Sequence, residues 1–170
     1  HTRGAVVKSR LWGMGSARVV LAGIARDRAR LECAREIGID EVVNVDERDP
    51  LEAVRDLTDG RGADIVFECA GVAESLATCW QAVRNEGTLV PVGMYPGPIK
   101  TDFGSISMKE LRVIGTYGYV WTSWQRTVRL LAEGRIVSGE LVSHAFSLEA
   151  FEEAFRTTRN GKGVKVIFEP

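Results

Sequence analysis

The fold is decided by residues 41–69, which read EVVNVDERDPLEAVRDLTDGRGADIVFEC. The first five of these residues are rich in β-branched side chains and are followed by turn formers, which is typical of a short buried strand. Asp49 and Pro50 then suit the N-cap and the first position of a helix that Gly60 would end. A second apolar run at residues 63–69 completes a strand–helix–strand unit, which predicts two parallel strands joined by a helix.

The same alternation extends in both directions along the chain. Strands are expected at residues 18–22, 41–45, 63–69, 88–92, 111–115 and 163–168. Helices are expected at residues 27–37, from Pro50 to Gly60, at 75–84 and 122–133, and after a capping Ser147. In the last two helices we expect the apolar side chains to face inward, namely Trp124, Val128, Leu131, Leu148, Phe151 and Phe155. This order predicts an α/β fold: a doubly wound parallel sheet with helices on both faces and ligand-binding loops at the carboxyl ends of its strands.

Composition narrows the class of protein. The 170 residues fit one domain, and an apolar content of 45% is enough to fill a core. A net charge of -1 with interspersed signs gives no electrostatic reason to expect nucleic acid or an anionic membrane surface. No apolar run approaches the roughly 20 residues of a membrane helix, so we expect a cytoplasmic protein. The three cysteines form no close pair, and neither His1 nor His144 lies near one, which argues against a disulfide framework or a closed zinc site.

Six segments, in order, resemble the medium-chain dehydrogenase superfamily, which includes the zinc-type alcohol, sorbitol and threonine dehydrogenases. They lie at residues 18–38, 40–45, 62–71, 87–93, 109–116 and 161–166. The first five are similar to the second to sixth strands of the family's nucleotide-binding part, and the last is similar to its returning C-terminal strand. Each segment alone is a weak signal, but six in the right order and spacing cover nearly the whole chain. The resemblance implies a Rossmann-like fold.

Two parts of the family pattern have no counterpart in this sequence. The first strand and its G-x-G-x-x-G loop would precede residues 4–8, and Gly13 and Gly15 form too short a motif, placed before a strand. The catalytic domain with its zinc ligands is also missing, so the resemblance implies that zinc binds only there. We expect an incomplete dinucleotide-binding domain at residues 1–142 and, at residues 143–170, a segment that would return to the catalytic domain. Without its central first strand the sheet would expose two strand edges, unless the start of the chain is rearranged, for example by exchange between chains.

The end of the first expected strand bears on the choice of cofactor. Gly23 stands where an NAD enzyme of this fold has an acidic residue that binds the ribose hydroxyls. Glycine removes that carboxylate, and Arg26 and Arg28 could pair with a 2′-phosphate, which favours NADP over NAD. Both arginines could equally be solvated side chains at a helix start, and Asp27 could neutralise either of them.

The other candidate cofactor residues come from small side chains at strand ends and from the resemblance. They are Val45, Ala70, Gly71, Val92, Gly93, Met94, Thr116, Tyr117 and Lys165. Short side chains at Gly71 and Gly93 would let the backbone approach the nicotinamide half of the cofactor. The resemblance places Thr116 and Tyr117 opposite the carboxamide, and it places Lys165 near the pyrophosphate.

Plainer roles stay open for several of these residues. Gly71 could serve a strand-to-helix turn, Tyr117 could pack at a dimer edge, and Lys165 could be an exposed strand lysine. Glu68 and Cys69 are expected in the core of a strand, and no histidine or lysine lies near enough in sequence to activate the thiol. No catalytic residue is therefore predicted within this chain.

Three functions fit the sequence. The leading one is an oxidoreductase whose full-length form moves a hydride between a secondary alcohol, such as a polyol, and NAD(P). The alternatives are a non-catalytic nucleotide-binding module and a zinc-independent quinone-type reductase. We expect this chain alone to be inactive and to bind NAD(P) weakly or not at all, because a pyrophosphate loses its helix N-terminus without the glycine loop. The resemblance also implies a homodimer, joined through the strand from Leu111 to Tyr119.

Overall fold

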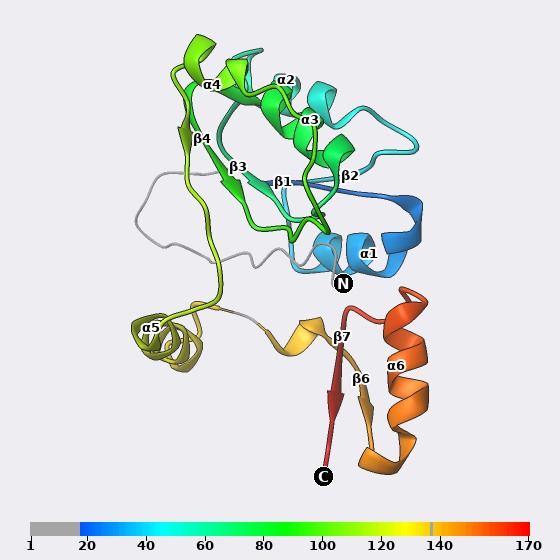
Figure 1. Ribbon diagram of the computed structural model, residues 1–170. Coiled ribbons are helices and arrows are strands. Elements are labelled where there is room, and N and C mark those ends of the chain that lie inside the picture. Colours follow the sequence, from blue (N-terminus) through cyan, green and yellow to red (C-terminus); the bar gives the residue numbers. More distant parts are fainter. Residues whose placement is uncertain (1–17, 137) are drawn as a thin grey trace. The chain divides into compact units, whose positions relative to one another are not determined.

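The computed structural model of the protein describes residues 18–136 and 138–170 (Figure 1). The chain splits into two compact units. Of the described residues, Asp49–Gly118 form the first unit, and residues 18–48 and 119–170 form the second. The predicted boundary after residue 142 falls inside the second unit and stays a prediction. Gly13, Gly15 and the rest of residues 1–17 lie outside the described part of the chain.

The first unit contains a parallel sheet with the strand order β3–β4–β5. β3 is Ala63–Glu68, β4 is Val83–Pro91 and β5 is Arg112–Val113. The helices of this unit are α2 (Pro50–Thr58), α3 (Ala73–Ala82) and α4 (Gly104–Met108). Leu89 of β4 pairs with Val66 of β3 on one side and with Val113 of β5 on the other. The strand–helix–strand order is as predicted, whereas α4 lies in a stretch for which no helix was predicted.

The core of the first unit forms where α3 packs against β3 and β4 (Figure 1). Leu76, Cys79 and Trp80 of α3 are buried there together with Leu89 of β4. Full burial of each large apolar side chain contributes roughly 1.5–3 kcal/mol. Trp80 Nε1 donates to Thr101 Oγ1 at 2.6 Å, so the buried indole keeps a hydrogen bond.

Specific side chains cap the helices of the first unit. Asp49 accepts the amide of Leu51 at 2.9 Å, which confirms its predicted role as the N-cap of α2. The C-terminus of α3 is capped from a distant residue, since Lys109 Nζ donates to Trp80 O at 2.7 Å and to Val83 O at 2.9 Å. A cation at this position also offsets the negative end of the helix dipole.

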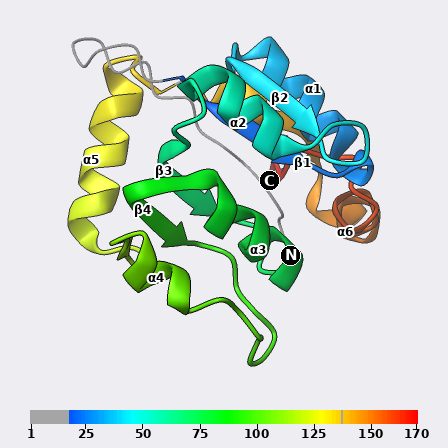
Figure 2. The same cartoon turned by 90° about the horizontal axis from the view of Figure 1, so that it is seen from above.

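The second unit contains two parallel strand pairs. β1 (Val20–Gly23) pairs with β2 (Glu41–Asn44), and β6 (Val142–Phe146) pairs with β7 (Lys165–Phe168). The helices are α1 (Arg28–Glu36), α5 (Trp121–Ala132) and α6 (Phe151–Arg159), with short 3-10 turns at Ala25–Asp27, Gly139–Leu141 and Leu148–Ala150. α1 packs on β1 and β2 (Figure 2), where Leu21, Leu31, Ala34 and Ile39 form a buried cluster. The predicted strand at the end of the chain is therefore present, and β6 is its unpredicted partner.

All strand pairs in the described residues are parallel, which confirms the predicted α/β class. Within residues 18–136 and 138–170, β1 pairs only with β2, and β3 pairs only with β4.

Several side chains that were predicted to face inward are exposed. Those in or beside α5 and α6 are Trp124, Val128, Leu131, Leu148, Phe151 and Phe155. On β3, Ile65 is 56% exposed and Phe67 is 61% exposed. Helical or strand periodicity identifies an apolar face but not the element that covers it. These corrections therefore concern the burial of the apolar side chains, whereas the helices and strands that carry them were predicted at these positions.

Candidate functional site

The loops that follow β3 and β4 are joined by backbone hydrogen bonds at the carboxyl ends of the strands. The amides of Val92 and Gly93 donate to the carbonyl oxygen of Glu68 at 2.7 and 2.8 Å. Five predicted site residues lie in these loops, namely Ala70, Gly71, Val92, Gly93 and Met94. The structure thus brings together, within the first unit, five of the residues expected to contact the nicotinamide half of a cofactor.

Two glycines make the contact between these loops possible. Gly71 has φ +67°, a conformation that favours glycine, and a Cβ placed there would lie 2.5 Å from Met94 O. A Cβ on Gly93 would lie 2.2 Å from Gly71 N. Neither position leaves room for a side chain, so the backbones of the two loops touch. The predicted alternative for Gly71, a turn residue, is compatible with this second role.

Glu68 lies beneath both loops and is fully buried, with 0% of its surface exposed. Its Oε1 accepts the amides of Ala70 at 2.9 Å and Gly71 at 3.0 Å. Its Oε2 accepts the hydroxyl of Tyr95 at 2.6 Å. The carboxylate therefore takes hydrogen bonds from the loop after β3 and from the loop after β4.

Thiols and a phenol surround this carboxylate and stay protonated at neutral pH. Burial raises the pKa of Cys79 to about 12, and the charge of Glu68 adds to that effect. Burial and then Glu68 also raise the pKa of Cys69. The pKa of Tyr95 is raised well above its usual range, first by burial and then by its hydrogen bond to Glu68. None of these groups is an activated nucleophile.

The second unit carries the residues expected near the adenosine half. Val45, which follows β2, donates its amide to Gly23 O at 2.9 Å, so these two predicted residues are neighbours. Ala25 donates its amide to Asp46 Oδ2 at 2.8 Å and ties the loop after β1 to the loop after β2. A Cβ on Gly23 would meet the Leu31 side chain at 3.0 Å, a contact that a small movement of that flexible side chain would relieve.

The two candidate arginines differ in the partners of their guanidinium groups. Arg26 donates from Nη2 to the carbonyl oxygen of Arg159, near the end of α6. The side chain of Arg28 is 84% exposed and donates from Nε to Glu32 at 2.8 Å. Asp27 is paired with Arg30, so it neutralises neither candidate through a direct ion pair.

The remaining predicted residues lie at exposed positions. Thr116 and Tyr117 come after β5, and Tyr117 is 90% exposed. Lys165 is the first residue of β7 and is exposed, with its backbone paired with that of Val142. The roles of Thr116, Tyr117 and Lys165 stay predictions.

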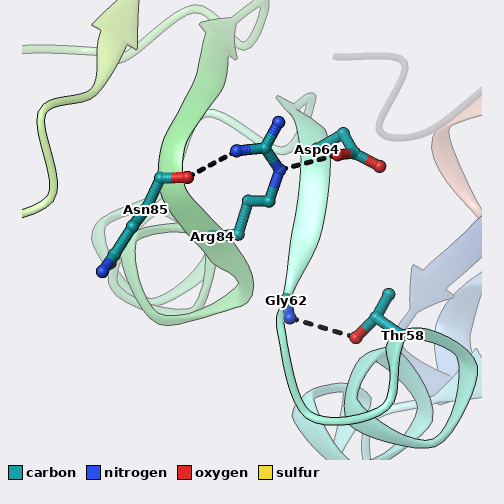
Figure 3. Close-up of polar contacts among 5 residues, drawn as sticks. All are labelled: Thr58, Gly62, Asp64, Arg84 and Asn85. Carbon is teal, nitrogen blue, oxygen red and sulfur yellow. Dashed lines mark hydrogen bonds and ion pairs between the residues drawn. The ribbon is translucent and has the colours of Figure 1, made fainter.

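A basic hollow of about 230 Å³ lies at the opposite, amino ends of β3 and β4. Its basic lining residues are Arg55, Arg61, Arg84 and Lys109. Arg84 already donates from Nε to Asp64 at 2.6 Å and from Nη1 to Asn85 O at 2.6 Å (Figure 3), and the lysine caps α3. The turn beside it is held by the amide of Gly62, which donates to Thr58 Oγ1 at 3.0 Å (Figure 3). Ligands of parallel sheets bind at the carboxyl ends instead, so this hollow is not the candidate site.

Metal-binding side chains do not gather in the described part of the chain. Within residues 18–136 and 138–170, no group of three or more His, Cys, Asp and Glu side chains could hold a metal ion. These residues therefore do not fit a zinc site.

No helix in the described part of the chain is long and apolar enough to cross a membrane.

Sequence reasoning missed three residues that shape these loops. Glu68 was expected in the core of a strand, and no individual contact was predicted for Tyr95 or Asp46. A signal was available for Glu68, because a carboxylate inside an apolar strand is rarely buried without a partner. Its partner Tyr95 is 27 residues away in sequence, and only the fold brings the two together.

The sequence profile described as zinc-binding dehydrogenase matches residues 9–133. This match covers more than half of the chain. The chain belongs to the zinc-binding dehydrogenase family. The resemblance carried by the six sequence segments is thereby confirmed.

Relatives of this zinc-binding dehydrogenase chain include polyol and amino-acid dehydrogenases. A sorbitol dehydrogenase from Halalkalibacterium halodurans is 32% identical over 153 residues, which are 89% of this chain and 45% of that protein. An L-threonine 3-dehydrogenase from Pyrococcus abyssi is 37% identical over 142 residues, which are 82% of this chain and 41% of that protein. The chain thus spans less than half the length of the curated relatives it matches.

Solved structures confirm the Rossmann-like fold of this family member. An alcohol dehydrogenase from a Thermus species matches with a TM-score of 0.81 at 26% identity, over 89% of this chain and 44% of that one. A 2R,3R-butanediol dehydrogenase from Bacillus subtilis matches with a TM-score of 0.79 at 24% identity, over 92% of this chain and 44% of that one. The second likeness is one of fold alone.

Proposed function

We propose that this chain is the cofactor-binding part of a zinc-type alcohol or polyol dehydrogenase. The whole protein would be an oxidoreductase that moves a hydride between a secondary alcohol and NAD(P). The observation that carries this proposal is the contact between Gly71 and Gly93 at the carboxyl ends of adjacent parallel strands. Ligands of open α/β sheets bind at that end, and the sorbitol and threonine dehydrogenase relatives act on alcohols of this class.

The described residues fit the nicotinamide half of such a cofactor. NAD(P), when bound, supplies the carbon that accepts or gives the hydride. The backbone at Ala70, Gly71, Val92 and Gly93 would contact that half, because glycine has no side chain that would hold a ligand away from the main chain. Holding the ring in one position lowers the entropy cost of the transfer. We assign zinc to a catalytic part outside this chain, since the described residues do not fit a metal site.

The adenosine half of the proposed site favours NADP over NAD. Gly23 places no carboxylate at the end of β1, and Val45 lies beside it. Arg28 is exposed although it is paired with Glu32, and Asp27 is paired with Arg30, so an exposed cation is available to a 2′-phosphate. Arg26 is the weaker candidate because it also caps α6.

The other assignments complete the proposal. Thr116 and Tyr117 would face the carboxamide, and Lys165 would lie near the pyrophosphate. Residues 143–170 would return to the catalytic part. A homodimer would form through the strand from Leu111 to Tyr119, because the described residues provide no second partner for β5 and its edge is free to pair with a second copy. A cytoplasmic location fits the three free cysteines.

A full-length protein that carries this chain is the material for the test. Oxidation of polyols and simple secondary alcohols is followed by the absorbance of the reduced nicotinamide, with NAD and NADP supplied separately. We expect activity that a zinc chelator abolishes. Activity that survives chelation would instead indicate the quinone-type reductase, and dinucleotide binding without turnover would indicate the non-catalytic module.

The cofactor preference has its own matched pair of variants. Gly23→Asp restores a carboxylate that would repel a 2′-phosphate, and we expect the affinity for NADP to fall about tenfold or more relative to NAD. Gly23→Ala adds the same Cβ without the charge and should leave the preference unchanged. Equal shifts in both variants would contradict the assignment to NADP, because the Leu31 contact alone would then explain the effect.

A further inference from the structure

Glu68 is a buried carboxylate without an ion-pair partner in the described residues. It is fully buried. Burying a carboxylate is costly unless hydrogen bonds replace its water. An apolar side chain would fill the same space without that cost. The hydrogen bonds that the carboxylate accepts therefore explain why a glutamate is present at this position.

Its hydrogen bonds all come from the two loops of the candidate site. Oε1 accepts the amides of Ala70 and Gly71, and Oε2 accepts the Tyr95 hydroxyl at 2.6 Å. The Gly71 amide also lies 3.2 Å from Oε2, so it is shared between the two oxygens. The loop after β4 is close enough that a Cβ on Gly93 would lie 2.6 Å from Oε2.

We propose that Glu68, with Tyr95 as its partner, is a positioning residue for the cofactor. It holds the two loops at a fixed separation, so that their backbones form one surface for the nicotinamide half. This inference rests on the proposed function. The four groups involved belong to the first unit alone, so the device is complete within residues 68–95.

The direction of the hydrogen bonds supports this role. The groups that hydrogen-bond to the Glu68 side chain, namely the amides of Ala70 and Gly71 and the Tyr95 hydroxyl, are donors, and a carboxylate is an acceptor. The raised pKa of Tyr95 keeps its phenol protonated, and therefore a donor, throughout the neutral range. Without this acceptor the amides of Ala70 and Gly71 would be left unpaired and would turn elsewhere.

Amide hydrogen exchange in the 170-residue chain tests the contact itself. Glu68→Gln places an amide group where the donors now converge, and exchange at Ala70 and Gly71 should become about tenfold faster or more. Tyr95→Phe removes a single hydroxyl and should give a smaller rise in the same two loops. Glu74→Gln, an equal charge change at an exposed position of α3, should leave exchange in both loops unchanged.

Ligand binding to a full-length protein that carries this chain tests the role. In Glu68→Gln and Tyr95→Phe we expect the Kd for the whole dinucleotide to rise about tenfold, while the Kd for ADP-ribose, which lacks the nicotinamide, stays unchanged. A merely structural defect would weaken both ligands equally.

Two results would overturn the inference: unchanged exchange at Ala70 and Gly71 in Glu68→Gln, or equal losses for the two ligands. A wild-type protein that binds neither ligand would overturn the proposed function. Exchange at Ala70 and Gly71 would still decide whether Glu68 holds the loops.

Discussion

Replacing Gly93 with alanine tests how closely the loops after β3 and β4 approach each other. The added Cβ would lie 2.2 Å from Gly71 N, 2.6 Å from Gly71 Cα and 2.6 Å from Glu68 Oε2. Ordinary contact begins at 3.4 Å, so the loops would have to separate by about 1 Å. None of these atoms yields easily, because two belong to the backbone and the third is held by the Tyr95 hydroxyl.

The cost follows from what that separation would break. Overfilling a packed site costs about 1–3 kcal/mol, and each weakened hydrogen bond to a charged group costs about 1.5–3 kcal/mol. We expect Gly93→Ala to lower the free energy of unfolding by about 3 kcal/mol. Gly97 lies further along the same loop, and a Cβ added there would meet nothing within 4 Å. Gly97→Ala should therefore change stability by less than about 0.5 kcal/mol.

Urea unfolding followed by circular dichroism measures both variants against the wild type. With a slope of about 2 kcal/mol per molar urea, the midpoint of Gly93→Ala should fall by about 1.5 M, and that of Gly97→Ala should stay close to the wild-type value. Equal midpoints for the two variants would refute the reasoning, because the loops would then have room that the structure does not show.

Three further outcomes are expected. Lys109→Met should lower the free energy of unfolding by about 2 kcal/mol, because the carbonyls at the end of α3 lose their donor. The control Lys100→Met, at an exposed position, should lower it by less than about 0.5 kcal/mol. Equal urea midpoints for the two variants would contradict this prediction. The Arg84 guanidinium lowers the pKa of Asp64, so this pair contributes stability above the ordinary aspartate pKa and loses it as the pH falls through the lowered value. Since Asp64 is largely exposed, Asp64→Asn should lower the free energy of unfolding by less than about 1 kcal/mol at neutral pH and should not change it in strong acid. Thermal unfolding that shows the same loss of stability at both pH values would contradict this prediction. Burial raises the pKa of Cys79 to about 12, so iodoacetamide at mildly alkaline pH should label this thiol slowly in the native protein and rapidly in urea. Peptide mass spectrometry measures both rates. Equally fast labelling in the native protein would contradict the prediction, because the thiol would then be accessible and ionised.

Local chemistry explains which parts of the fold were predictable. Asp49 and Pro50 mark the start of α2 through interactions within one helical turn, and the structure places that helix start at the predicted residue. Short β-branched runs likewise identified β1 to β3 to within two residues at either end. β4 begins earlier than predicted, at Val83, because Val83 pairs with Ala63 of β3; the register then shifts, and regular pairing resumes at Thr88. Pairing of that kind depends on the neighbouring strand and leaves no local signal.

Burial was less predictable because it depends on what covers a face. Trp124 and Phe155 lie on apolar helix faces that periodicity identifies correctly, yet both are exposed in the described structure. Ile65 and Phe67 form a similar exposed surface on β3. The chain spans less than half the length of its relatives, so a longer protein would have further segments available to cover such faces. A sequence pattern cannot show whether those segments are present.

The candidate site divides along the same line between local and distant contacts. Gly71 and Gly93 were chosen as candidates because small residues at strand ends are a local signal, whereas the contact between Glu68 and Tyr95 was not predicted because it joins separate loops. Yet the four residues depend on nothing outside residues 68–95 for the hydrogen bonds and close contacts described. The nicotinamide side of the site should therefore keep its geometry whatever covers the exposed faces elsewhere. For that reason Gly93→Ala and Glu68→Gln can be judged in this chain by stability and amide exchange, before any assay of dehydrogenase activity.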